Sequence, residues 1–65
     1  MNTDIIYSSK NYTIIRDNMT RYIWLYSYGK PIVYYDGSLH FNNKNGNMTQ
    51  STKNHFTFFK KLLDI

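Results

Sequence analysis

Two short turn signals within residues 22–41 constrain the fold of this chain more than any other feature. Gly29-Lys30 has glycine at the first of two central positions, which suits a type II′ hairpin turn, and Asp36-Gly37 is among the strongest short hairpin signals. The stretch around them, YIWLYSYGKPIVYYDGSLHF, is rich in the strand formers Tyr, Ile and Val. It therefore predicts three antiparallel strands joined by two two-residue loops.

Two-residue loops determine which residues lie opposite each other, and so which side chains share a face of the sheet. The predicted pairing places Trp24 opposite Tyr35, Tyr26 opposite Val33, and Tyr34 opposite Leu39. One face then carries Ile23, Leu25, Ile32, Tyr34, Leu39 and Phe41. The other face carries Trp24, Tyr26, Tyr28, Val33, Tyr35 and His40. Both faces are apolar enough to require cover.

Two further strands are predicted at Asp4 to Ser8 and at Tyr12 to Asp17, where β-branched and aromatic residues are frequent. A helix is predicted from about Ser51, since Thr49, Ser51 and Thr52 are all suitable N-caps. The expected fold is α+β: an antiparallel β-meander of four or five strands with one C-terminal helix packed on one face.

The predicted helix has an apolar stripe at spacings of three and four, made by Phe56, Phe59, Leu62 and Leu63. We expect this stripe to pack on the face that carries Leu25. Phe58 lies off the stripe, so it packs either at the sheet edge or in an interface. The polar residues 42–47 before the helix form either a simple connection or a mobile flap over a ligand.

The chain has 65 residues, which we interpret as a single small domain over residues 1–65. Such short chains bury only about 60% of their unfolded surface and usually need extra stabilisation. Cysteine is absent, whereas the chain holds one tryptophan, seven tyrosines and four phenylalanines. Since one helix covers one face, we expect a homo-oligomer, a dimer or higher, formed through Trp24, Tyr26, Tyr28 and Tyr35.

The cellular location is predicted from two features of the sequence. The N-terminus MNTDIIYSSK lacks the basic and apolar regions of a signal peptide, and no apolar run approaches the roughly 18 residues of a membrane span. We therefore expect a cytoplasmic protein that does not contact a membrane.

The predicted helix start is one candidate ligand site. The free amides and the positive dipole end of a first helical turn attract anions, and Ser51, Thr52, Lys53 and His55 would strengthen phosphate binding there. The alternative is a plain helix cap. The formal charge of +4 agrees with an anionic partner, and also with ordinary solubility charge.

The aromatic face is the second candidate site. Trp24, Tyr26, Tyr28 and Tyr35, with His40 beside them, could stack on nucleobases. The same rings could instead form the homodimer interface, because interfaces are enriched in Tyr and Trp. The two readings are compatible, and the sequence does not choose between them.

Catalysis and metal binding have little support in the sequence. A nucleophile would have to be Ser or Thr with His40 or His55 as its base. Glutamate and cysteine are absent, and the four aspartates are scattered, so paired carboxylates and metal ligands are not apparent. We expect a protein that is not an enzyme and that holds no metal or cofactor.

The chain resembles a family of very small phage and prophage proteins. The matching stretches are Leu25-Tyr26-Ser27-Tyr28, Pro31-Ile32-Val33, Asp36-Gly37-Ser38-Leu39, and Thr49-Gln50-Ser51-Thr52 followed by His55-Phe56 and Phe59. Lys30 and Asn54 depart from the family pattern, which has Thr and Lys at these positions.

This resemblance implies a counter-defence role. The first function it suggests is sequestration of a phosphate-bearing nucleotide immune signal, as a sponge that does not turn its ligand over. The alternatives are an inhibitor that docks on a host defence protein or CRISPR complex, and a basic nucleic-acid-binding module. The last is disfavoured because the basic residues are spread along the chain.

Overall fold

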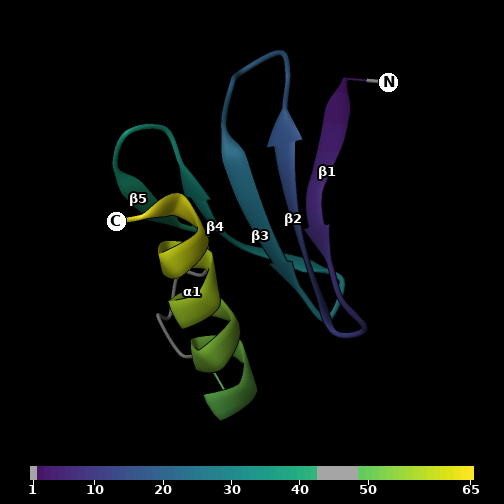
Figure 1. Ribbon diagram of the computed structural model, residues 1–65, viewed down its shortest axis with the longest axis vertical. Coiled ribbons are helices and arrows are strands. Elements are labelled where there is room, and N and C mark those ends of the chain that lie inside the picture. The colour runs from purple at the N-terminus through teal and green to yellow at the C-terminus, as the bar shows by residue number, and fades with distance from the viewer. Residues whose placement is uncertain (1, 43–48) are drawn as a thin grey trace.

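The computed structural model describes residues 2–42 and 49–65, and Figure 1 shows the arrangement of their helix and strands. The strands are β1 (Thr3–Ser8), β2 (Tyr12–Asp17), β3 (Ile23–Ser27), β4 (Lys30–Tyr35) and β5 (Leu39–Phe41), and the helix is α1 (Gln50–Leu63). The sheet order is β1-β2-β3-β4-β5, with every neighbouring pair antiparallel. The α+β meander is therefore confirmed, with five strands. Apart from Asn42, the loop predicted at 42–47 lies outside the described residues.

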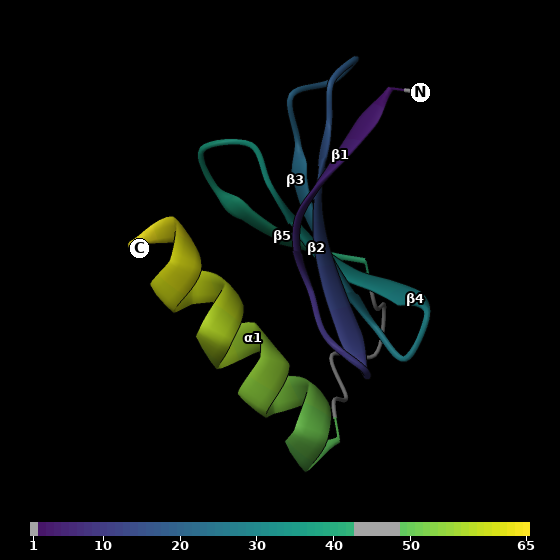
Figure 2. The ribbon, with the colours of Figure 1, turned by 45° about the vertical axis from the view of Figure 1, so that its right-hand side comes forward.

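Helix α1 lies across one face of the sheet and leaves the other face without cover from the described chain (Figures 1 and 2). The core between them consists of Ile14, Leu25, Val33 and Phe59, which are fully buried. Full burial of an aliphatic or aromatic side chain contributes about 1.5–3 kcal/mol. We call the side away from α1 the open face.

Both ends of α1 are capped by side chains or backbone that the local sequence provides. The Thr49 hydroxyl accepts from the backbone N–H of Thr52 at 3.2 Å, so the helix begins at Gln50, one residue before the predicted start. Asp64 takes the left-handed conformation, and its N–H donates to the carbonyls of Lys60 and Lys61.

The predicted apolar stripe is confirmed for Phe59, which is fully buried, and for Phe56 and Leu63, which pack against the core. It is wrong for Leu62, which is 38% exposed because it lies on the flank of the helix rather than over the sheet. Phe58 packs at the sheet edge, where its ring centroid is 4.8 Å from that of Tyr7.

The predicted register of the first hairpin is wrong. Ser27 pairs with Lys30, so the loop is Tyr28-Gly29 rather than Gly29-Lys30. Both loop residues have positive φ, 52° and 79°, which is the pattern of a type I′ turn. A bulge then leaves Ile32 without a partner on β3 and brings Leu25 opposite Val33.

The register of the second hairpin is also wrong by one residue. Tyr35 pairs with Leu39 and Tyr34 with His40, so the loop has the three residues 36–38. The Asp36 carboxylate closes it by accepting from the Ser38 N–H at 3.1 Å.

These shifts exchange the faces of β4 while the predicted faces of β3 and β5 hold. Val33 and Tyr35 turn toward α1, and Tyr34 turns to the open face. Ile32, at the bulge, packs against the core as expected. The assignment of Tyr35 and Val33 to the exposed aromatic face is therefore wrong. Within the described residues, no helix is long and apolar enough to cross a membrane.

Candidate functional site

The open face carries a row of aromatic rings centred on Tyr34. The Tyr34 ring stacks with Tyr22 and with His40, at centroid distances of 4.8 and 4.9 Å, and lies 4.8 Å from Trp24. Trp24 in turn lies 6.3 Å from Tyr26. Stacked and tilted rings at these distances attract each other, so the row is a preformed aromatic surface.

His40 is held at one end of this row by the second hairpin loop. Its Nε2 lies 3.0 Å from Oδ1 of Asp36, and the contact becomes an ion pair when the imidazole is protonated. The three-residue loop 36–38 thus holds the His40 ring nearly parallel to the ring of Tyr34.

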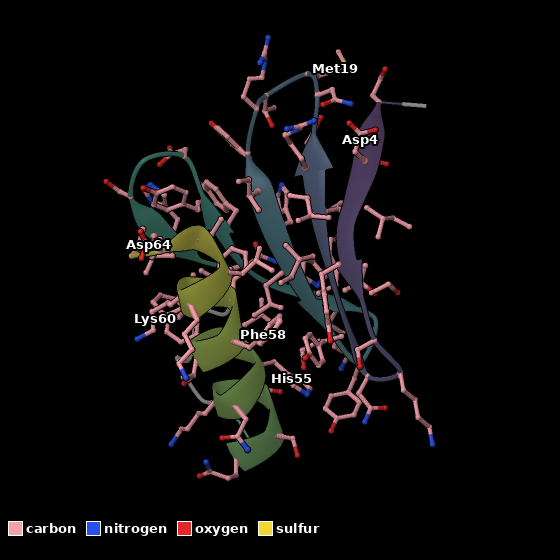
Figure 3. All side chains as sticks on the ribbon, in the orientation of Figure 1. Asp4, Met19, His55, Phe58, Lys60 and Asp64 are labelled. Atoms are coloured by element: carbon pink, nitrogen blue, oxygen red, sulfur yellow. The ribbon has the colours of Figure 1, made fainter. Side chains whose placement is uncertain are left out.

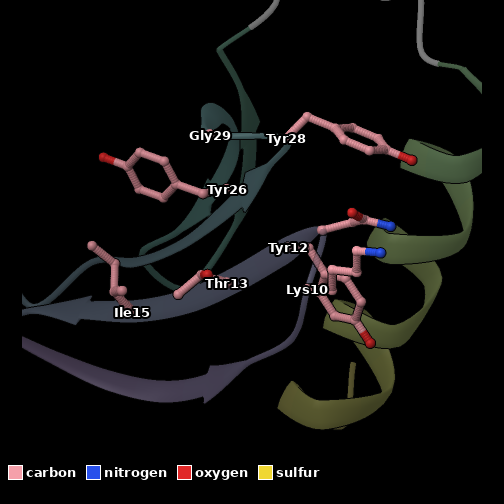
Figure 4. Close-up of a pocket in the computed structure, with 8 residues that line it drawn as sticks. Lys10, Tyr12, Thr13, Ile15, Tyr26, Tyr28 and Gly29 are labelled. Carbon is pink, nitrogen blue, oxygen red and sulfur yellow. The ribbon is translucent and has the colours of Figure 1, made fainter.

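A pocket of about 390 Å³ lies at the other end of the open face. Thr13, Ile15 and Tyr26 contribute from the sheet, and the turns between β1 and β2 and between β3 and β4 complete it (Figure 4). The eight lining residues are Lys10, Asn11, Tyr12, Thr13, Ile15, Tyr26, Tyr28 and Gly29. The volume lies within the range of small-molecule sites, about 300–1,000 Å³.

Tyr28, at the rim of this pocket, has a backbone conformation that bulky residues avoid. Its φ is 52°, and its side chain is 54% exposed. Asn or Gly would occupy this turn position with less strain. Strained positions that retain a large side chain are frequent at functional sites, which marks Tyr28 as a functional candidate.

A cluster of buried hydroxyl groups lies between β3 and the first turns of α1. The Ser27 Oγ is 3.1 Å from the Thr52 Oγ1 and 2.8 Å from the His55 Nδ1, and Thr49 donates to Thr52 at 3.1 Å. Ser27 is only 2% exposed and Thr52 only 6%. We call Thr49, Thr52, Ser27 and His55 the hydroxyl cluster.

His55 joins this cluster to the aromatic residues at the end of the sheet. Its ring stacks on Tyr12 at 4.2 Å and lies 5.6 Å from the ring of Tyr28. Figure 3 shows His55 and Phe58 on the side of α1 that faces the strands. Burial lowers the pKa of His55 below the ordinary value of 6.5, which favours the neutral imidazole.

The four residues predicted to bind an anion at the helix start lie in two different environments. Ser51 and Lys53 are exposed, whereas Thr52 is buried with its hydroxyl bonded inside the cluster and His55 is partly buried against the sheet. These four side chains therefore do not converge on one anion site.

The predicted aromatic site is brought together only in part. Trp24, Tyr26 and His40 share the open face, Tyr28 lies in the adjoining turn, and Tyr35 packs on the α1 side. Tyr22 and Tyr34 were missed, the second through the register error. Ser27 was also missed, although strand alternation from Ile23 and Leu25 places it on the helix face.

The geometry of Ser27 and His55 resembles that of a nucleophile and its base, but Ser27 is too buried for a substrate to reach its hydroxyl in this structure. No group of three or more His, Cys, Asp or Glu side chains suited to a metal occurs within residues 2–42 and 49–65.

Comparison of the chain with protein-family models, curated proteins and solved structures found no match. The pocket and the open face are therefore the basis for a functional proposal.

Proposed function

We propose that this protein is a non-enzymatic binder of a phosphate-bearing nucleotide, with the base stacked on Tyr26 and the phosphate held near Lys10. One observation carries the proposal: the 390 Å³ pocket is lined both by Tyr26 of the open face and by Lys10 of the β1–β2 turn. Asn11 and Thr13 add an amide and a hydroxyl that can bond a base edge or a ribose.

The charge of the lining residues favours a ligand with little negative charge. Lys10 alone among the eight carries a charge, and none of them is a carboxylate that could hold Mg²⁺. A nucleoside triphosphate binds most readily as its magnesium complex and needs several cationic partners. A cyclic nucleotide or a nucleotide with one phosphate group fits this pocket better.

The resemblance to small phage proteins gives this binding a biological setting, in which the nucleotide is an immune signal of the infected cell. A sponge needs only to hold its ligand intact. The burial of Ser27, the one hydroxyl bonded to a histidine among the described residues, agrees with binding rather than turnover.

The first test is titration calorimetry with cyclic nucleotides, nucleoside monophosphates, ADP-ribose derivatives and magnesium ATP. We expect binding of cyclic nucleotides and nucleoside monophosphates in preference to magnesium ATP, and release of intact ligand on denaturation as seen by HPLC. The absence of binding to every nucleotide in this panel would refute the proposal.

Variants of the pocket give the second test. Tyr26→Ala should weaken binding by the loss of one base stack, about 1–3 kcal/mol. Lys10→Ala should weaken it as well, whereas Lys61→Ala, which removes the same charge from the exposed end of α1, should not. Equal losses of affinity in the two lysine variants would mean that the net charge of the protein, and not a phosphate site at Lys10, determines binding.

A second candidate is an inhibitor that docks on a host defence protein, and the aromatic row beyond the pocket favours it. Tyr22, Trp24 and Tyr34 extend over the open face, and Tyr and Trp are enriched at interface hot spots. Recovery of a stoichiometric host protein with the wild type, and its loss with Tyr34→Asp, would support this function. A direct nucleic-acid binder would instead show affinity that falls steeply with salt.

A further inference from the structure

We infer that His55 is a pH-sensitive anchor that holds the rim of the pocket from the α1 side. Its parts are the hydrogen bond between Ser27 and His55 and the ring contacts of His55 with Tyr12 and Tyr28. The inference rests on the proposed function, because it concerns the regulation of the same pocket.

The contacts of Tyr12 and Tyr28 connect the anchor to the pocket. Both residues line the pocket, yet their rings extend toward α1, away from Tyr26 and Ile15 (Figure 4). There both rings contact His55. The two sides of the rim, the start of β2 and the β3–β4 turn, are thus held by one imidazole.

The hydroxyl cluster selects the neutral form of this imidazole. Thr49 donates to Thr52, and the contacts of Ser27 with Thr52 and with the Nδ1 of His55 fit a continuous order of donation, from Thr52 to Ser27 and from Ser27 to Nδ1. In this order Nδ1 accepts and the proton of the neutral ring is on Nε2. None of the buried side-chain polar atoms of the described residues lacks a partner.

Protonation of His55 disrupts this order. Nδ1 becomes a donor to Ser27, so the Ser27 proton must turn toward Thr52, and the Thr52 proton is then left without an acceptor in the cluster. The cluster then holds one more donor than before and no additional acceptor. Burial opposes the charge as well, which agrees with the lowered pKa of His55.

The groups that face His55 offer little compensation for a positive charge. Tyr12 from β2 and Tyr28 from the turn place phenol rings and no carboxylate against His55, and a hydrogen bond with Tyr7 raises the pKa of Tyr12 above its ordinary value. Lys10 and Lys53, on the neighbouring turn and on α1, are cations. Three aspartate side chains are engaged elsewhere, in contacts with Arg16, Met19 and His40, and the fourth aspartate, Asp64, lies at the opposite end of α1.

The expected result is a loss of affinity on acidification. As the pH falls below about 6.5 and His55 takes up its proton, the rim loosens and ligand binding weakens. Because one proton is involved, the affinity should change by at most about tenfold per pH unit.

The experiment combines calorimetry with NMR of the wild-type protein between pH 5.0 and 7.5. Cyclic AMP is the probe, because its phosphodiester does not titrate in this range, whereas a phosphate monoester has a second pKa of about 6. We expect the ring signals of Tyr12 and Tyr28 to shift with the same midpoint as His55, below 6.5, and the affinity for cyclic AMP to follow.

Two histidine variants separate the anchor from other titrations. His55→Phe keeps a ring against Tyr12 without a titrating group, so its binding should not depend on pH. His40→Gln, at the far end of the aromatic row, should keep the wild-type pH dependence. The inference is overturned if the Tyr12 and Tyr28 signals do not follow His55, or if the pH dependence disappears with His40 instead. If cyclic AMP does not bind at any pH, the proposed binding of cyclic AMP is refuted. The NMR titration of Tyr12 and Tyr28 then still tests whether His55 anchors the rim.

Discussion

At the scale of single residues, Tyr28 is the position where local preference and the observed structure conflict most. A bulky residue at a φ of 52° costs roughly 1–2 kcal/mol in the left-handed region, and Asn or Gly would relieve it. The side chain is nevertheless large, half-exposed and part of the pocket rim.

We expect Tyr28→Asn to leave stability unchanged or to raise it by up to about 1 kcal/mol, and to weaken cyclic AMP binding. Chemical denaturation and calorimetry on the same variant check both parts. The contrary result, a destabilised turn with intact binding, would remove Tyr28 from the site.

Asp64 provides the matched case at a position remote from the pocket. It also has a left-handed backbone, with a φ of 59°, at the C-cap of α1. Asp64→Gly should stabilise the fold by about 1 kcal/mol, because glycine avoids the cost of roughly 1–2 kcal/mol that a side chain adds in this conformation. Thermal unfolding measures the gain, and nucleotide binding should be unaffected.

At the scale of elements, α1 is attached to the sheet mainly through Phe59. This ring is fully buried against Ile14, Leu25 and Val33, whereas Leu62 on the same helix is 38% exposed. Phe59→Ala should lower the free energy of unfolding by about 3–5 kcal/mol, the usual range for a buried phenylalanine.

Leu62→Ala is the control, since it truncates a side chain of the same helix that buries far less area. We expect a loss of well under 2 kcal/mol, as measured by urea denaturation. Similar losses in the two variants would mean that α1 does not pack in the orientation of Figure 2.

At the scale of the whole molecule, the open face is an aromatic surface that the described chain leaves without cover. We expect self-association through Trp24, Tyr26 and Tyr34, because a small domain with one helix buries only one side of its sheet. Tyr34→Asp or Trp24→Ala should then shift the protein to monomers in sedimentation, with the fold retained.

Tyr35→Asp distinguishes the two faces of β4. Tyr35 packs against the core beneath α1, so a carboxylate there should destabilise the fold instead of dissociating an oligomer. A wild-type protein that sediments as a stable monomer would rule out the self-association, and a folded monomeric Tyr35→Asp would reverse the assignment of the faces.

The stability of the whole molecule should also depend on pH in two separate ranges. The lowered pKa of His55 means that the unfolded chain takes up the proton first, so stability is full above pH 6.5 and falls as the pH drops through the pKa of the folded state. Hydrogen bonds from Asn18 and Arg16 lower the pKa of Asp4, and that contribution is lost as the pH falls below about 3.8. Melting temperatures across pH should show both steps, and His55→Phe should remove the upper one.

The sequence by itself determined the type and order of the elements, and the number of strands to within one. Strand-forming residues, alternation and capping hydroxyls are local properties, and they placed β2 at its observed bounds and the start of α1 within one residue. Alternation also predicted correctly that Leu25 is buried and that Trp24 and Tyr26 share the other face.

Only the tertiary structure decided the register of β4 and the composition of the site. Turn preferences are worth about 1 kcal/mol or less, whereas burying Val33 beside Leu25 and Phe59 contributes about 1.5–3 kcal/mol, so packing overrides the glycine signal at the first turn. The contacts of Ser27 with Thr52 and His55 join side chains that are separated in the sequence by 25 and 28 positions. Such a contact depends on how α1 lies on the sheet, which no local pattern in the chain specifies.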